Sequence, residues 1–178
     1  DPTYAGEVNS NEPKTWLEWA AAFAPPDCEP CKLDIGGVIW KKPVKKAPPV
    51  SLPSAFLLND LKKSAKLKNA SFAIAGYGKN AIPDIPDGFR RFGGCGFGSL
   101  TPNLITLSQK VRQGESSFGT HDSGSPAFWV DPVTGELVLV GVLSGGAPEM
   151  YGDYARLDLP QTLEFLELVL DAVDAGFF

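Results

Sequence analysis

The pattern of apolar and polar positions predicts a chain built mainly from short β-strands. Runs rich in β-branched and aromatic residues cover residues 33–40, 71–78, 89–98 and 104–111, and the first of these is expected to be a buried strand. A proline-rich stretch, residues 41–53, follows the first strand and predicts an extended linker between two lobes.

Helical patterns are few. Apolar residues recur at near-helical spacing in residues 15–23, which predicts a short helix there, and residues 57–67 fit either a helical turn or a loop. Near the C-terminus, Asp158 is placed to cap a helix, and Pro160 falls in its first turn, where the missing N–H costs nothing. The apolar face expected for this helix consists of Leu163, Leu166, Leu170 and Val173.

The last third of the chain also predicts a β-hairpin. Residues 127–130 and 137–144 read as strands, and they flank the turn-forming residues 131–135. Several short strands followed by one C-terminal helix indicate an all-β barrel architecture.

Composition narrows the class of protein. The 178 residues are 43% hydrophobic and 21% charged, which is ordinary for one globular domain or two small lobes. The net charge of −5 argues against nucleic acid as a partner, and no apolar run reaches the roughly 18 residues that a membrane span needs. Two lysine-rich runs, within residues 41–46 and 62–68, favour a solvated face or linker over a polyanion site.

Three cysteines leave at least one unpaired within the chain. Cys28 and Cys31 fit a local disulfide, two free thiols or half of a zinc site, and Cys95 could pair with a segment upstream of this chain. The first residue is Asp1 rather than Met, which predicts a processed chain or a fragment. Any export signal would then lie upstream.

The clearest chemical motif is Gly-Thr-His-Asp-Ser-Gly-Ser-Pro at residues 119–126, followed by an apolar strand. Ser123 stands between an aspartate and small residues, where a tight turn exposes its hydroxyl and directs backbone N–H groups at one point. Acyl transfer needs this combination, because one group must add to the carbonyl carbon while donors hold the oxyanion that develops.

This motif resembles the trypsin/chymotrypsin family of serine endopeptidases, in which the nucleophile lies in Gly-Asp-Ser-Gly-Gly/Ser-Pro before a strand. Residues 140–146 and 151–157 are similar to the two walls of that family's specificity pocket, and residues 33–44 and 76–78 are similar to segments upstream of the nucleophile. The resemblance implies a chymotrypsin-like double β-barrel. Residues 1–50 would be the tail of the first barrel with the interlobe linker, and residues 51–178 would be most of the second barrel with the C-terminal helix.

The resemblance also implies roles for single residues. Ser123 would be the nucleophile, and Asp34 would orient the catalytic histidine. The backbone N–H groups of His121 and Ser123 would form the oxyanion hole, and Asp122 would be a structural carboxylate holding that loop. No metal or organic cofactor is required.

Substrate binding is implied for a further set of residues: Ser117, Ser144, Gly145, Gly146 and Gly152. Ser117 would be a neutral pocket floor, which disfavours basic side chains because it cannot repay the desolvation of a buried cation. Gly146 and Gly152 would leave the pocket open for Phe, Tyr or Leu. The implied partners are polypeptide substrates or a protein inhibitor, and the implied location is extracellular, as a secreted protein.

One departure from the family pattern affects function directly. The chain has a single histidine, His121, so the base histidine expected upstream of Asp34 is absent from these residues. The isolated chain is therefore expected to be inactive, since a serine hydroxyl without its base is a poor nucleophile. The alternative interpretation is a non-catalytic protease homologue that binds a protein partner through the substrate groove.

Overall fold

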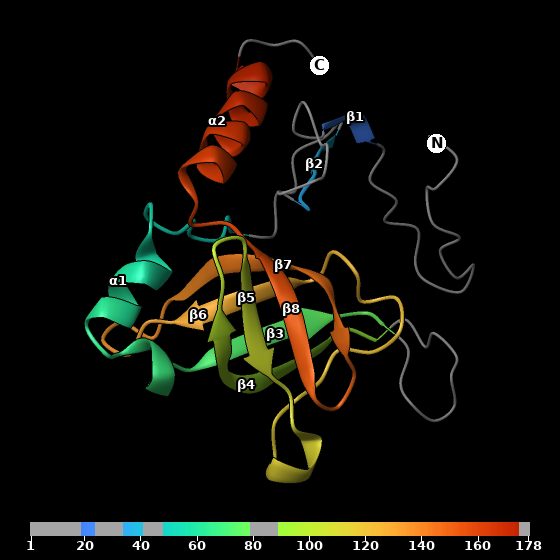
Figure 1. Cartoon of the computed structure of the whole chain (residues 1–178). Coiled ribbons are helices and arrows are strands. Elements are labelled where there is room, and N and C mark those ends of the chain that lie inside the picture. Colours follow the sequence, from blue (N-terminus) through green and yellow to red (C-terminus); the bar gives the residue numbers. More distant parts are fainter. Residues whose placement is uncertain (1–18, 24–33, 41–47, 79–88, 175–178) are drawn as a thin grey trace.

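The computed structural model describes residues 19–23, 34–40, 48–78 and 89–174, and its centre is a closed barrel of antiparallel strands (Figure 1). Six strands form the barrel in the order β3-β4-β5-β8-β7-β6, and β6 pairs back with β3. Their bounds are Phe72–Gly76 (β3), Arg91–Leu100 (β4), Leu104–Ser108 (β5), Pro126–Val130 (β6), Leu137–Ala147 (β7) and Tyr151–Arg156 (β8). The expected strands, the hairpin and the barrel are thereby confirmed.

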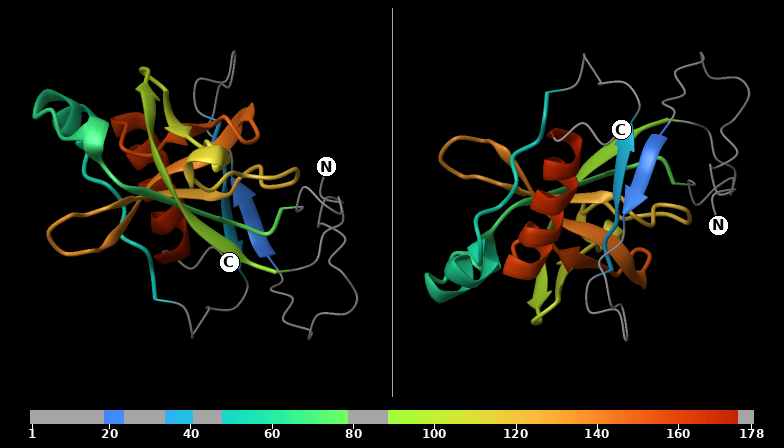
Figure 2. Two further views of the ribbon diagram at one scale, coloured as in Figure 1. Left: turned by 90° about the horizontal axis from the view of Figure 1, so that it is seen from below. Right: turned by 90° about the horizontal axis from the view of Figure 1, so that it is seen from above.

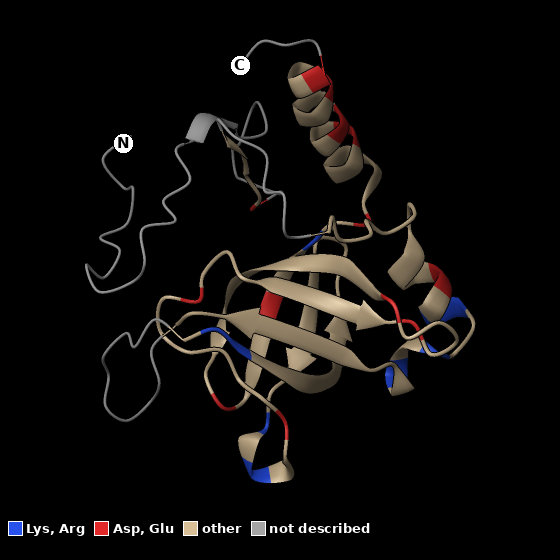
Figure 3. Ribbon diagram, turned by 180° about the vertical axis from the view of Figure 1, so that it is seen from behind, with Lys and Arg blue, Asp and Glu red and all other residues tan. Residues whose placement is uncertain are grey.

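The barrel interior is filled by the apolar residues of the alternating pattern. In β5, Ile105 and Leu107 are fully buried while their neighbours are not, as expected for a strand with one face in the core. β3, β5, β6 and β7 contain no charged residue, and most charged positions lie in loops and helices (Figure 3). Each large side chain buried in this way stabilises the fold by about 1.5–3 kcal/mol.

Helix α1 (Leu57–Lys63) and the 3-10 helix η1 (Leu67–Asn69) cover one end of the barrel. Leu58, Leu61 and Leu67 insert into the core from these helices, whereas the lysines of residues 62–68 remain exposed. A second 3-10 helix, η2 (Val111–Gln113), follows β5. Residues 41–46, the other lysine-rich run, lie outside the described residues.

Strands β1 (Trp19–Phe23) and β2 (Gly37–Trp40) form a separate two-stranded antiparallel sheet. The helix expected over residues 15–23 is therefore wrong for residues 19–23, because pairing with β2 overrides the local helical spacing. The buried character expected for the first strand is also wrong. Val38 and Trp40 are 53% and 45% exposed, because they alternate with the residues that face helix α2.

Helix α2 (Pro160–Asp174) lies beside β2, where the α-carbon of Gly37 approaches the side chain of Val169 (Figure 2). The C-terminal helix is confirmed, but its expected apolar face is not. Thr162 and Phe165 are buried, whereas Leu170 and Val173 are 56% and 44% exposed. The reason is that only the first turns of α2 lie against the barrel end.

The predicted helix cap at Asp158 is a second correction. The buried Asp158 carboxylate accepts a hydrogen bond from the backbone N–H of Leu58 at 2.9 Å, and so caps the start of α1, 100 residues earlier in the chain. It also forms a two-pronged ion pair with Arg156, at 2.8 and 2.9 Å. None of the helices in the described residues combines the length and apolar character needed to cross a membrane.

Candidate functional site

The turn that carries Ser123 is fastened to the rim of the barrel. Ser125 N–H donates to the Asp122 carbonyl at 2.9 Å, which closes the turn around Ser123. Gly124 N–H donates to the Leu143 carbonyl at 2.9 Å, and Leu143 N–H donates to the Ser125 carbonyl at 2.8 Å. Because these bonds join the turn to β7, Ser123 is held in a fixed place with its side chain exposed.

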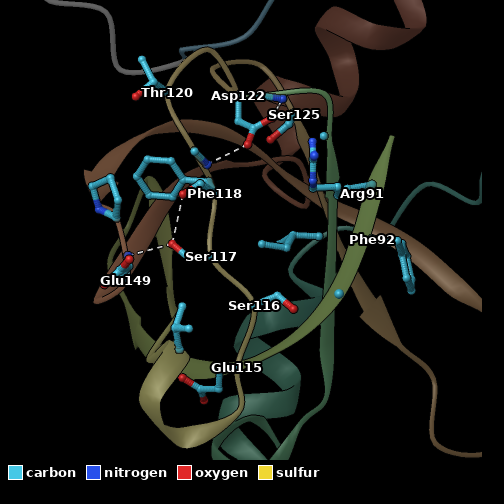
Figure 4. A pocket seen from close by; sticks show the side chains of 18 residues that line it. Arg91, Phe92, Glu115, Ser116, Ser117, Phe118, Thr120, Asp122, Ser125 and Glu149 are labelled. Atoms are coloured by element: carbon cyan, nitrogen blue, oxygen red, sulfur yellow. Dashed lines mark hydrogen bonds between the residues drawn. The ribbon is translucent and has the colours of Figure 1, made fainter. Parts of the chain in front are cut away.

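The Asp122 carboxylate holds this turn in place through two hydrogen bonds from backbone N–H groups (Figure 4). Its two carboxylate oxygens accept hydrogen bonds from the backbone N–H of Gly78 at 2.6 Å and of Gly119 at 2.7 Å. A Cβ at Gly76 or Gly78 would overlap the carboxylate, so the end of β3 must lack side chains there. The Asp122 carboxylate is therefore held by the backbone of its own loop and of the segment that follows β3.

His121 adopts the left-handed backbone conformation, with φ of 73°, and its side chain is exposed. Glycine adopts this conformation without strain, whereas histidine does so at a cost. Within the described part of the chain, no group accepts a hydrogen bond from the backbone N–H of His121 or Ser123. These two donors are the ones to which the sequence assigned the oxyanion.

Asp34 lies at the same rim as the Ser123 turn. The Ser144 hydroxyl donates a hydrogen bond to the Asp34 carboxylate at 2.6 Å, across 110 residues of sequence. Leu143, the neighbour of Ser144 in β7, holds the turn that follows Ser123. Two adjacent residues of β7 thus gather the expected nucleophile and the expected orienting carboxylate, while the one histidine of the chain, His121, points to solvent.

The expected substrate pocket is largely filled by the chain itself. The ring of Phe118 reaches to 3.1 Å from the position that a Cβ on Gly146 would occupy. Beneath Gly152, the amide of Gln109 and the ring of Tyr154 both lie 2.8 Å from the corresponding position. The open pocket expected from Gly146 and Gly152 is therefore wrong, because neighbouring side chains occupy the space that the glycines leave.

The remaining predicted pocket residues differ in their surroundings. The Ser117 hydroxyl accepts a hydrogen bond from Glu149 N–H at 2.8 Å and donates one to the Phe118 carbonyl at 3.0 Å. Ser144 is exposed, and no atom beyond residues 144–146 lies within 4 Å of a Cβ placed on Gly145. Space for a substrate side chain thus remains at the entrance, beside Gly145, and not at the floor.

A cavity of about 720 Å³ lies on the other side of the loop that carries Ser117 and Phe118 (Figure 4). Its far wall comes from β3 and β4, including Gly76 and Arg91. Ser117 and Asp122 line it, but the other residues predicted from the sequence do not: Asp34, His121, Ser123, Ser144, Gly145, Gly146 and Gly152. The cavity therefore reaches the Ser123 turn at Asp122 and Ser125, although Ser123 itself does not line it.

Sequence reasoning did not identify Phe118 and Gln109. Gln109 is fully buried, and its side-chain amide links β8 to the Phe118 loop: it donates to the Tyr154 hydroxyl at 2.8 Å and accepts from Phe118 N–H at 3.2 Å. Neither residue belongs to a motif. The position of Phe118 beside Ser117 was the one available signal, because a large side chain next to a pocket floor must lie in or near the pocket.

Cys95 is a free thiol in the described part of the chain and is buried in the barrel core, so its expected pairing with an upstream segment stays a prediction. Cys28 and Cys31 lie outside the described residues. Among the residues with described positions, no group of three or more His, Cys, Asp or Glu side chains is arranged to hold a metal ion. No family model matches the chain, and no curated protein is significantly similar to it.

Proposed function

We propose that this chain is the nucleophile-bearing part of a secreted serine endopeptidase related to the trypsin/chymotrypsin family. One observation supports this above all others. Leu143 and Ser144, adjacent in β7, hold the Ser123 turn and the Asp34 carboxylate at one rim of the barrel. A serine and a carboxylate brought together from distant parts of the chain are two of the three groups that a serine protease needs.

The proposed chemistry follows from these positions. The Ser123 hydroxyl attacks the carbonyl carbon of a peptide bond and passes its proton to an imidazole oriented by Asp34. The backbone N–H groups of His121 and Ser123 stabilise the oxyanion, and collapse of the intermediate returns the proton to the leaving amine. Water then hydrolyses the acyl-enzyme. The imidazole comes from a histidine outside these 178 residues, because His121 is exposed and lies in the turn itself.

The fold is compatible with this proposal. In this proposal the closed barrel and α2 would form the second barrel of a chymotrypsin-like double barrel, and the β1–β2 sheet would be the tail of the first. In that arrangement Asp34 lies between the two barrels, where it can orient an imidazole from the first while Ser123 projects from the second.

Added imidazole tests the proposal on the chain as it exists. The protein is mixed with an N-acetyl-alanine p-nitrophenyl ester, and the mass of the acylated protein is measured, because imidazole also cleaves such esters without protein. Without imidazole, acylation should not exceed that of Ser123→Ala, since the base is missing. With imidazole, acylation should rise about tenfold or more and depend on Ser123, and Asp34→Asn should reduce the rise.

The alternative is a non-catalytic homologue that binds a protein partner through the same groove. The observation that favours it is the single exposed histidine, His121. If imidazole produces no acylation that depends on Ser123, the alternative is supported and the proposed enzyme is wrong. Acylation without imidazole would instead identify His121 as the base.

A further inference from the structure

The side chain of Phe118 lies at the pocket of the proposed enzyme, and its role there rests on the proposed function. Phe118 is half-buried and packs against the barrel core. Its ring edge approaches Gly146 on β7, the strand that also holds Asp34 and the Ser123 turn. The ring therefore lies between the loop of Ser117 and the wall where a substrate side chain would enter the proposed enzyme.

The gap beside the ring is too narrow for a second ring. Phe118 Cε1 lies 3.1 Å from the Cβ position on Gly146. An inserted aromatic side chain needs a carbon contact of about 3.5–4.0 Å on each of its two faces, or roughly 7–8 Å between the walls. The backbone of β8 also lies close on this side, because the same Cβ position on Gly146 would overlap the Tyr151 carbonyl oxygen and the α-carbon of Gly152.

Phe118 is also fixed at its backbone. Its N–H donates to the side-chain oxygen of Gln109 at 3.2 Å, and its carbonyl accepts from the Ser117 hydroxyl at 3.0 Å. Gln109 is fully buried and donates to the buried Tyr154 hydroxyl at 2.8 Å. Moving the loop outward would leave buried polar groups without partners, at a cost of about 1–3 kcal/mol for each. The ring is therefore a fixed part of the wall.

We propose that Phe118 determines primary specificity by filling the pocket, so that the enzyme accepts Gly, Ala or Ser before the cleaved bond. The space that remains lies at the entrance, beside Gly145, where no atom beyond residues 144–146 lies within 4 Å of a Cβ on Gly145. A methyl or hydroxymethyl group fits there. A benzyl or isobutyl group meets the ring of Phe118.

The first test measures the pocket without any chemistry. Phe118→Ala should bind phenol saturably, with NMR shifts confined to residues around Gly146 and Gly152, and the wild-type chain should not. Phe92→Ala is the matched control. It removes a phenylalanine that is 63% exposed and lines the neighbouring cavity, so it leaves the proposed pocket filled and should behave as the wild type.

The second test compares acylation of Ser123 by N-acetyl-alanine and N-acetyl-phenylalanine p-nitrophenyl esters in the presence of imidazole. The wild-type chain should prefer the alanine ester, and Phe118→Ala should shift the ratio toward the phenylalanine ester by about tenfold or more. If Phe118→Ala loses its circular dichroism signal, Phe118→Leu serves in its place, with a shift in the same direction.

The outcomes separate the two proposals. A wild-type chain that prefers the phenylalanine ester, or that binds phenol beside Gly146, overturns the inference about Phe118 and leaves the proposed function in place. Absence of Ser123 acylation by either ester overturns the proposed function, and with it the assignment of specificity. Phenol binding by Phe118→Ala alone would then still show that Phe118 fills this pocket.

Discussion

At the residue scale, burial changes the acidity of two side chains in the barrel core. Burial raises the pKa of the Cys95 thiol to about 12, and the nearby negative charge of Glu115 adds to the effect. Burial likewise raises the pKa of the Tyr154 hydroxyl, with a smaller opposing effect from its hydrogen bond to Gln109. Both groups are therefore neutral in the folded protein at moderately alkaline pH.

Stability should fall as the pH rises from about 9 to about 12. In the unfolded chain the Cys95 thiol loses its proton near its ordinary pKa of 9.0, whereas in the folded chain it keeps the proton to about 12. Rising pH therefore favours the unfolded state, by up to about 1.4 kcal/mol per pH unit for this one group. Urea unfolding at several pH values checks this. Cys95→Ala should show a shallower decline, and an equal decline would contradict the assignment.

The backbone at His121 gives a second prediction. Replacing His121 with glycine should raise the free energy of unfolding by up to about 1 kcal/mol, because it removes the strain of the left-handed conformation. The adjacent Thr120 has no positive φ, so Thr120→Gly should lower stability instead. Chemical denaturation of both variants measures the difference. A marked loss of stability in His121→Gly would show that the imidazole makes contacts that outweigh the strain.

The site residues that belong to a sequence motif could be predicted from the sequence, whereas those outside the motif could not. Ser123, Asp122 and His121 lie within eight consecutive residues whose order is informative. Phe118 packs near Gly146 of β7, and the buried amide of Gln109 bonds to Tyr154 of β8, so both depend on how far these strands lie from the loop that follows β5. No local pattern records such a distance, so the filling of the pocket could not be predicted.

At the scale of elements, Arg156 and Asp158 form a buried ion pair that joins several segments. Both side chains are almost completely inaccessible, at 2% and 0%. Arg156 also donates to the Thr101 carbonyl and to the Asn59 side chain, while Asp158 caps α1. The pair therefore connects the β4–β5 turn, α1 and the start of α2. The sequence predicted Asp158 as the cap of α2, which begins at Pro160, but its carboxylate caps α1.

Removing one member of this pair should destabilise the protein strongly. Asp158→Ala leaves the Arg156 guanidinium buried without its counter-charge and removes the cap of α1, so the loss should be about 3–5 kcal/mol. The exposed pair of Lys63 and Asp60 on α1 provides the comparison, and Asp60→Ala should change stability by less than about 1 kcal/mol. Thermal and urea unfolding measure both variants. Similar effects would argue against a structural role for the buried pair.

At the scale of the whole molecule, the closed barrel and the β1–β2 sheet should differ in local stability, because their strands differ in how many neighbours they pair with. Every barrel strand pairs on both sides, and the barrel encloses the main core cluster. The β1–β2 sheet has only two strands, and isolated two-stranded sheets are marginally stable. Alternation in the sequence predicted the barrel strands individually. Their pairing order was not predictable, because it depends on contacts between distant segments.

Hydrogen exchange should reveal this difference. The amides of Phe72, Ile105 and Leu107 should open only with global unfolding, whereas those of Val38 and Trp40 should exchange at least about a hundredfold faster. Mass spectrometry of peptides after timed labelling gives the comparison. Equal protection of β2 and β5 would mean that the two-stranded sheet is held by contacts beyond those of its own pair and α2.

The place of β8 in the barrel has a consequence for synthesis of the chain. β8 is the last of the six barrel strands in chain order, yet it lies between β5 and β7 and pairs with both. Until Tyr151–Arg156 has left the ribosome, β5 and β7 each present an unpaired edge that can pair with another chain. The nascent barrel therefore depends on β8 to cover two sites of aggregation at once, and truncation before β8 would leave both exposed.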